Sequence, residues 1–535
     1  MSLTTSNTDL FINNTLHFES KVINIEQVII PNSITDAKFG ILNLKAISSQ
    51  ISEEDNDLIF MVDCSASMSD ICSDGRDKMH HIVHTLKNMV LYFKENPTIK
   101  IHITIDAFDD SIYRILDRSF VNEDNYESII TKINKITPRN STDIQLALTS
   151  LKNTAATIRN DFPNNNIVNI FMTDGEVTTG STNHSVLAEI VDRNITNAFI
   201  GFGIEHDTTL LNALSNGENS AYYFIDKLEN SGLVYGEILH GIVYKLLKDV
   251  YLSVKNGFIY DFKNNIWVDK LYVGEIISEA NKNYHIISSN PDDCAVILSA
   301  NKINYSNKSD KNVTITISRI EEYTDNTKYI YRQRTLQHLS IASDFIKRKN
   351  LTNNTDELLF RFNINNQENK SLKQEGITIK GNLRKFITEM KNYIQDNNME
   401  DDKFMKNLCD DIYICYRTFS TKFGGMYTCA RLTSQGTQRC YTVSHTPEES
   451  TQELYSTNPI RLTRQTNLHS SIINDSFEDD LQYSVSDSAE FEDLQHSVSD
   501  FIDTPYLTPS STQVMRDISI GTQRDYEYGN NHTEL

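Results

Sequence analysis

The spacing of apolar residues changes several times along this chain. Between about residues 57 and 226, short continuous apolar runs alternate with segments whose apolar residues recur every three or four positions. Continuous runs of strand length predict strands buried on both faces, and the wider spacing predicts amphipathic helices. The alternation therefore predicts a doubly wound α/β domain with a parallel sheet over residues 55–250, closed by a long helix at about 228–250.

Residues 15–50 and 251–320, on either side of this domain, instead alternate apolar with polar positions. This period of two is typical of antiparallel strands with one solvated face. The simplest packing pairs the two flanks into one β-sandwich, with the α/β domain inserted between them. The flanks therefore predict a second core that is built from both sides of the insertion.

Helical periodicity returns at about 326–349 and 382–418, and the Gly- and Thr-containing segments around 424–443 favour a β-hairpin. Beyond residue 446 the chain is rich in Ser, Thr, Asp and Glu and has no sustained period, which predicts disorder. The predicted organisation is an N-terminal β segment (1–54), the α/β domain (55–250), the β-sandwich (251–322), a helical segment with a terminal hairpin (323–445) and a disordered acidic tail (446–535).

The acidic charge is concentrated in this tail. Residues 445–535 contain 17 Asp and Glu against 4 Arg and no Lys, which accounts for −13 of the formal net charge of −22. A chain of this charge is a poor partner for nucleic acid or anionic membranes. No apolar run is long enough for a membrane span, the first thirty residues lack the pattern of a signal peptide, and the seven cysteines show no paired spacing. We therefore expect a reducing, cytoplasmic location.

Oxygen-bearing side chains stand at three predicted loops of the α/β domain. Asp63, Ser65 and Ser67 follow the apolar run 58–62, Thr142 precedes a predicted helix, and Asp174 follows a second buried run. In open α/β sheets, ligands bind outside the carboxyl ends of the strands. We expect these loops to converge at that edge.

Two carboxylates and three hydroxyls form a hard donor set with little negative charge. Such a set suits Mg²⁺ better than zinc or copper, with Mn²⁺ or Ca²⁺ as alternatives. A bound ion would keep a net positive charge. It could therefore accept an Asp or Glu carboxylate from a partner protein.

These residues resemble the metal-ion-dependent adhesion site (MIDAS) of the von Willebrand factor type A (vWA) family. The family pattern is Asp-x-Ser-x-Ser, then a Thr from a second loop, then an Asp after a later strand. Asp63, Ser65, Ser67, Thr142 and Asp174 match it in order. The resemblance implies that Ser65, Ser67 and Thr142 touch the metal, and that Asp63 and Asp174 act directly or through water.

The chain departs from the family pattern in the second loop, where Asn140 replaces a customary Gly. Asn tolerates the left-handed backbone conformation better than most residues, so we expect the loop to persist. The wider layout resembles inter-alpha-trypsin-inhibitor heavy chains and intracellular vWA proteins of protists and large DNA viruses. The resemblance implies a non-enzymatic interaction module.

Two other functions are compatible with the same residues. A Mg²⁺-dependent phosphohydrolase also begins from an Asp after the first strand, but normally needs a second carboxylate where this chain has Ser65. In a scaffold protein, the metal would be structural, and the helical segment and tail would bind the partners. The sequence leaves the partner and the oligomeric state open.

Overall fold

The computed structural model describes residues 12–22, 28–31, 34, 36–47, 51–72, 75–174, 177–203, 206–225, 231–303, 311–320, 325–359, 366–420, 424–440 and 504–529. These residues form two compact units. The first contains three β-sheets with their helices and the last helix of the chain. The second contains the described helices between residues 327 and 437.

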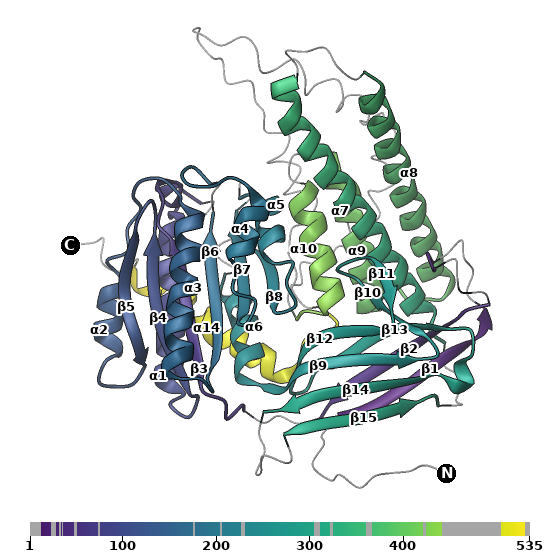
Figure 1. Ribbon diagram of the computed structural model, residues 1–535, viewed down its shortest axis with the longest axis horizontal. Helices are drawn as coiled ribbons and strands as arrows, with labels where there is room; N and C mark the ends of the chain where they lie inside the picture. The colour runs from purple at the N-terminus through teal and green to yellow at the C-terminus, as the bar shows by residue number, and fades with distance from the viewer. Residues whose placement is uncertain are drawn as a thin grey trace. The chain divides into compact units, whose positions relative to one another are not determined.

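A six-stranded sheet lies at the centre of the α/β part of the first unit (Figure 1). Its strand order is β5-β4-β3-β6-β7-β8, and all strands are parallel except β5, which pairs antiparallel with β4. The strands are β3 (Asn56–Asp63), β4 (Ile101–Phe108), β5 (Ile112–Phe120), β6 (Asn166–Thr173), β7 (Thr196–Phe202) and β8 (Ser220–Ile225). Every residue of β3 is buried, as its continuous apolar run predicts.

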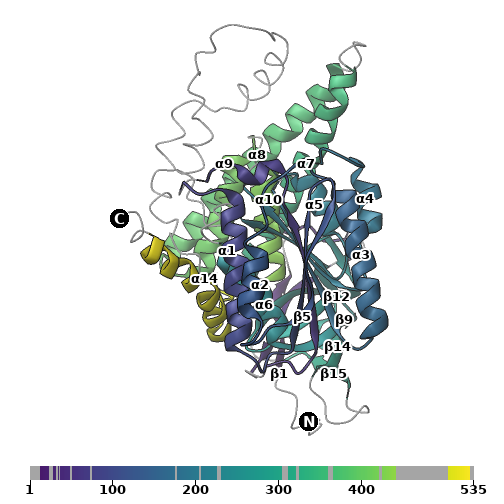
Figure 2. The same ribbon diagram turned by 90° about the vertical axis from the view of Figure 1, so that its left-hand side faces the viewer.

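Helices cover both faces of this sheet, which confirms the predicted doubly wound arrangement (Figure 2). One face carries α1 (Lys78–Glu95), α2 (Tyr126–Ile133) and α6 (Ser231–Val243). The other carries α3 (Ile144–Asp161), α4 (His184–Ile190) and α5 (Thr208–Leu214). A short 3₁₀ helix, η1 (Ala66–Ser69), follows β3.

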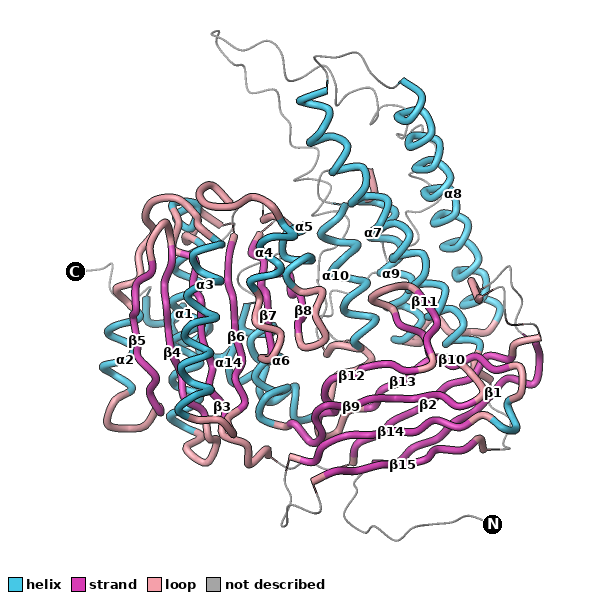
Figure 3. The backbone as a smooth tube through the Cα atoms, viewed as in Figure 1, coloured by secondary structure: helices cyan, strands magenta, loops and turns pink. Residues whose placement is uncertain are grey.

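Two antiparallel sheets form the rest of the first unit's β-structure (Figure 3). The first sheet contains β1 (Ile12–Val22), β2 (Lys38–Ala46), β13 (Asn281–Ser288), β10 (Phe258–Asp261) and β11 (Ile266–Val268) in that order. The second contains β12 (Lys270–Ile277), β9 (Lys245–Lys255), β14 (Ala295–Lys302) and β15 (Asn312–Ser318). Strand β2 pairs with β13, and Leu16, Leu42, Leu252 and Val296 share one apolar core. The N-terminal strands thus pair with later ones across the inserted α/β part.

The predicted long helix at 228–250 is wrong at its C-terminal end. Helix α6 ends at Val243, and β9 begins at Lys245. Burial along β9 alternates from residue to residue over most of its length, so its apolar residues line one face of a sheet instead of extending a helix. The Leu- and Val-rich sequence suits either structure, and pairing with β12 and β14 decides for the strand.

The prediction of a disordered tail is wrong for residues 509–529. They form helix α14 (Pro509–Gly529), which packs on α6 and α1. Val514, Met515 and Ile518 are buried. The amide of Asn88 on α1 donates to the carbonyl of Ile518 at 3.0 Å. Residues 446–503 and 530–535 lie outside the described residues, so disorder stays a prediction there.

Two glycines of α6 allow α14 to approach closely. A Cβ atom at Gly236 would lie 2.5 Å from the Cα of Met515, and one at Gly232 would lie 2.9 Å from the Oγ of Ser519. Such distances are far below van der Waals contact, so the helices can pack at this separation only where α6 lacks side chains. The spacing of four residues places both glycines on one face of α6.

The second unit is helical, with α7 (Thr327–Leu359), α8 (Asn366–Asp396), α9 (Lys403–Thr418) and α10 (Gly424–Thr437). The predicted hairpin at 424–443 is wrong over 424–437, where α10 forms, and residues 441–443 lie outside the described residues. Buried Met426, Tyr427, Ala430 and Ser434 recur at helical spacing, and α10 packs against α7 and α9. No described helix is long and apolar enough to cross a membrane.

Candidate functional site

Strand β3 delivers Asp63 to the carboxyl edge of the six-stranded sheet. Its side chain is fully buried, and its Oδ1 accepts a hydrogen bond from the backbone amide of Ser65 at 2.8 Å. Its Oδ2 accepts from the Thr173 hydroxyl, at the end of neighbouring β6, at 2.6 Å. Both carboxylate oxygens are thus oriented by the two central strands.

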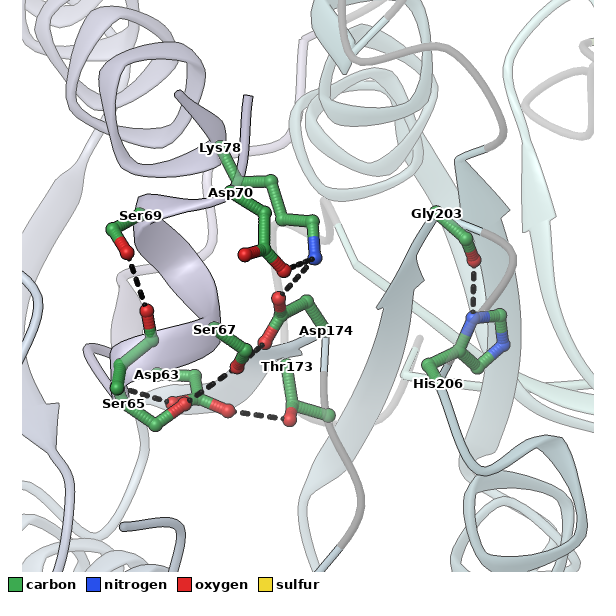
Figure 4. A network of polar contacts seen from close by, with 11 residues as sticks. Asp63, Ser65, Ser67, Ser69, Asp70, Lys78, Thr173, Asp174, Gly203 and His206 are labelled. Atoms are coloured by element: carbon green, nitrogen blue, oxygen red, sulfur yellow. Dashed lines mark hydrogen bonds and ion pairs between the residues drawn. The ribbon is translucent and has the colours of Figure 1, made fainter. Parts of the chain in front are cut away.

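Ser65, Ser67 and Asp174 continue this network across the same edge (Figure 4). The hydroxyl oxygens of Ser65 and Ser67 lie 3.1 Å apart, and the Ser67 hydroxyl donates to Asp174 Oδ1 at 2.8 Å. Asp174 is almost completely buried. Because β3 and β6 are parallel neighbours in register, the loops that follow them meet at one end of the sheet. The structure therefore brings four of the five predicted residues together.

Lys78 is a further member of the network that the sequence did not single out. Its Nζ donates to Asp174 Oδ2 at 2.6 Å and to Asp70 Oδ2 at 3.1 Å. Burial lowers the pKa of Lys78, but the hydrogen bonds and charges of Asp174 and Asp70 outweigh it and raise the pKa above its usual value. Lys78 is therefore an ammonium ion at neutral pH.

Thr142 lies outside the hydrogen-bond network that joins the other four residues. It is buried, and its backbone amide donates to the Thr178 hydroxyl at 2.7 Å. Its loop nevertheless contacts the first one, since Arg139 donates its amide to the Cys64 carbonyl at 2.7 Å and the Ala66 amide donates to Asn140 at 3.0 Å. The second loop is thus fixed against the first by backbone hydrogen bonds.

The departure at Asn140 does not require a strained backbone, because Asn140 is not among the described residues with positive φ. Other carboxylates near the site have structural roles. Asp77 caps α1 by accepting from the His80 amide, and Asp143 caps α3 by accepting from the Leu146 amide. Asp74, a further acidic residue of the first loop, lies outside the described residues.

Burial raises the pKa of Asp63 to about 6, although hydrogen bonds from Thr173 and Ser65 act in the opposite direction. The ordinary carboxyl value is near 4, so the site disfavours an uncompensated negative charge on Asp63. A nearby cation would reverse this preference, because it stabilises the ionised carboxylate. The buried carboxylate of Asp63 would therefore be stabilised by a positively charged neighbour.

The donors that converge here are carboxylate and hydroxyl oxygens, which fits a hard divalent cation. Among the described residues, no group of three or more His, Cys, Asp or Glu side chains is placed to hold a metal ion. This finding excludes a zinc-type cluster of such ligands in that part of the chain. It does not bear on a site in which hydroxyls supply most of the donors.

Sequence reasoning missed Lys78 and Thr173, and one signal could have revealed the lysine. Lys78 is the first residue of α1, immediately after its N-cap Asp77. The helix dipole disfavours a cation at this end. A lysine at this position therefore indicates a specific anionic partner nearby. Thr173 gives no such signal, because a Thr at a strand end is common.

His206 lies apart from this network, in the loop after β7 (Figure 4). Its ring nitrogens lie 2.7 Å from the Gly203 carbonyl oxygen and 2.7 Å from the Tyr222 hydroxyl. A Cβ atom at Gly201 would come within 2.4 Å of the ring. Burial lowers the pKa of His206 to about 4, so the folded chain holds the ring neutral.

This burial predicts a loss of stability in mild acid. The ordinary pKa of 6.5 applies to the unfolded chain, so the stabilisation is complete above pH 6.5 and disappears as the pH falls towards 4. We expect the free energy of unfolding to fall by about 2 kcal/mol more in wild type than in His206→Gln between pH 7 and pH 5. Urea titrations at both pH values measure the difference. If the free energy of unfolding fell by the same amount in both proteins between pH 7 and pH 5, a neutral buried ring would be contradicted.

A model of the von Willebrand factor type A domain family matches residues 57–236. The chain thus contains a vWA domain, as the sequence pattern predicted, and domains of this family commonly mediate protein–protein interaction. The matched residues include the whole six-stranded sheet except the first residue of β3.

Solved structures to which this chain is similar include the ArnB paralog VWA2 from Sulfolobus acidocaldarius. It is 12% identical, with a TM-score of 0.46 over 80% of this chain and 98% of that chain. A vWA protein from Catenulispora acidiphila is 13% identical, with a TM-score of 0.43 over 63% of this chain and 80% of that chain. No curated protein matches the sequence.

Proposed function

We propose that the vWA domain binds a protein partner through a divalent cation, with Mg²⁺ as the preferred ion and Mn²⁺ or Ca²⁺ as alternatives. Asp63, Ser65, Ser67, Thr142 and Asp174 would hold the ion. The ion would supply a positive charge that accepts an Asp or Glu carboxylate of the partner. The chain acts as a binding module and not as an enzyme in this proposal.

One observation carries the proposal, namely the continuous network from Ser65 through Ser67 to Asp174 beside the buried Asp63. Four oxygen-bearing side chains from two different loops converge at the edge where open α/β sheets bind ligands. The raised pKa of Asp63 adds support, because a cation would relieve the unfavourable burial of its charge. The family match supports protein binding as the general role.

The chain's own residues would have separate tasks at this site. The Ser65 and Ser67 hydroxyls offer neutral oxygens, and Asp174 offers a charged one. Thr173 and the Ser65 amide hold the Asp63 carboxylate in a fixed orientation, as partners of a metal ligand commonly do. A low total charge from the protein leaves the ion able to attract the partner's acid.

The test is a selection of random peptides displayed on phage against the full chain in Mg²⁺. We expect the selected peptides to share an Asp or Glu, and to lose binding by about a hundredfold when it becomes Asn or Gln. The same loss is expected with EDTA and with Asp63→Ala, because each removes the cation from the contact. Fluorescence anisotropy of a labelled selected peptide measures the affinity.

Asp124→Ala is the matched control, because Asp124 is an exposed acid in the turn before α2, far from the site, and its removal should leave the affinity unchanged. Ser67→Ala provides a milder variant if Asp63→Ala unfolds, which circular dichroism would reveal. Peptides that bind equally well with EDTA, or that need no acid, would refute the proposal. Failure to select any peptide would also count against it.

The arrangement of the site residues gives no support to the phosphohydrolase alternative. Asp63 has Ser65 two residues later, where a second carboxylate is needed for proton transfer. Lys78, the lysine that contacts the network among the described residues, is already bonded to Asp174 and Asp70. Turnover of p-nitrophenyl phosphate in Mg²⁺, lost in Asp63→Ala, would revive this alternative.

A further inference from the structure

Asp174 has two acceptor oxygens, and the structure assigns them to different donors. Oδ1 accepts from the Ser67 hydroxyl at 2.8 Å, within the predicted metal site. Oδ2 accepts from the Lys78 ammonium at 2.6 Å. Asp174 has no exposed side-chain surface, and Lys78 is only 14% exposed. The charge of Asp174 is therefore neutralised by a largely covered cation that belongs to the chain itself.

Lys78 also has a second anionic partner within reach. Its Nζ lies 3.1 Å from Asp70 Oδ2, and the Asp70 side chain is 57% exposed. An ion pair with an exposed carboxylate needs less desolvation than one with a buried carboxylate. The ammonium can thus remain paired with Asp70 if another cation takes Asp174.

The position of Lys78 on α1 is unfavourable by itself. It is the first residue of the helix, where unpaired backbone amides and the helix dipole repel positive charge. The carboxylates of Asp70 and Asp174 compensate for this repulsion. A divalent cation at Asp174 would add a second repulsion, because two cations would then share one carboxylate.

We propose that Lys78 competes with the divalent cation for Asp174 and so sets the metal affinity of the site. The inference rests on the metal site of the proposed function but not on the identity of the partner. A metal ion at Asp174 would repel the ammonium, which would then keep Asp70 as its partner. Lys78 therefore weakens metal binding, whereas Asp70 assists it by receiving the displaced ammonium. The site responds to a higher concentration of free Mg²⁺ than its oxygen donors alone would need.

Two substitutions of opposite effect test this competition. In the full chain, Lys78→Met removes the competing charge and should lower the Kd for Mg²⁺ by about tenfold or more. Asp70→Asn removes the alternative partner of the ammonium and should raise this Kd by several fold. Isothermal titration calorimetry with Mg²⁺ alone gives both values, and electron paramagnetic resonance with Mn²⁺ provides an independent measurement.

Lys87→Met is the matched control, since Lys87 lies on the same helix about 13 Å further along its axis. It should leave the Kd unchanged. Lys78→Gln keeps hydrogen-bond donors for Asp174 without the charge, and replaces the methionine variant if that one unfolds. A second readout is thermal unfolding. In EDTA, Lys78→Met should melt below wild type because Asp174 is left buried without a cation, and Mg²⁺ should raise its melting temperature more than that of wild type.

The outcomes separate this inference from the proposed function. If wild type binds Mg²⁺ and Asp63→Ala does not, but both Lys78 variants bind as wild type does, the metal site stands and the competition is refuted. If the Lys78 variants alone bind Mg²⁺, the competition is supported and the proposed function of the wild-type site fails. If no protein binds Mg²⁺ or Mn²⁺, both are overturned.

Discussion

Replacement of Arg431 by methionine is expected to destabilise the helical unit by about 3–5 kcal/mol. Arg431 on α10 donates to Asp411 on α9 at 3.0 Å, and the two side chains are only 4% and 1% exposed. The variant would leave a carboxylate buried without its cation, which is much more costly than removing both charges. Chemical denaturation of the full chain, followed by circular dichroism, measures the loss.

The pH dependence of this variant provides a specific check. Burial raises the pKa of Asp411 to about 6 even beside Arg431, and loss of the arginine should raise it further. If the pKa of a carboxyl group is higher in the folded chain than in the unfolded one, the folded chain loses stability as the pH rises between the two values. The deficit of Arg431→Met should therefore be larger at pH 7.5 than at pH 5.

A surface ion pair in the same unit provides the control. Arg348 pairs with Glu375 between α7 and α8, and their side chains are 53% and 40% exposed. Solvent screens this pair, so Arg348→Met should cost at most about 1 kcal/mol. The double variant Asp411→Leu/Arg431→Met should recover much of the loss, because both charges of the pair are removed together. If Arg431→Met and Arg348→Met lowered the free energy of unfolding equally, the special cost of breaking the buried pair would be contradicted.

Gly236→Ala is expected to cost about 3 kcal/mol and to weaken the docking of α14. A single methyl group there would lie 2.5 Å from the Cα and 3.0 Å from the backbone nitrogen of Met515. Backbone atoms of a packed helix cannot move aside as a flexible side chain can, so the cost belongs to the upper part of the range for overpacking. Denaturation gives the free energy, and hydrogen exchange of residues 509–519 reports on the docking.

Gly241→Ala on the same helix is the control, because the nearest atom that its methyl group would meet in the described part of the chain is Ile277 Cδ1, at an ordinary 3.7 Å. It should stabilise α6 by up to about 1 kcal/mol, since alanine favours helices more than glycine does. In a chain that ends at residue 505 and so lacks α14, Gly236→Ala should have the same small stabilising effect as Gly241→Ala. If the alanine remained equally costly without α14, close packing of α14 would not be the cause.

The sequence was a reliable guide to the α/β part and to most of the candidate site. Leu58 to Val62 form a continuous apolar run of strand length, and such a run is typical of a central strand with both faces covered. Once two such runs are parallel neighbours, the residues that follow them must share one edge of the sheet. The convergence of Asp63 and Asp174 was predictable for this reason.

The structure corrected the sequence wherever a segment suits two conformations. Residues 245–255 can continue a helix or form a strand, and only pairing with β12 and β14 decides. Residues 424–437 carry Gly and Thr that favour a hairpin, yet α7 and α9 offer a surface that buries one helical face. The intrinsic preference of such a segment for helix or strand is smaller than the free energy of this packing. Tertiary contacts therefore determine which structure forms.

By itself, the sequence determined the parallel sheet, the order of its loops and the oxygen donors that those loops carry, because these follow from local periodicity and from the geometry of strand ends. The tertiary structure alone decided which side chains meet. It placed Lys78 on Asp174 and α14 on the glycine face of α6, although these partners are distant in sequence. Contacts of this kind depend on how whole elements pack, and a local pattern does not specify which two residues meet.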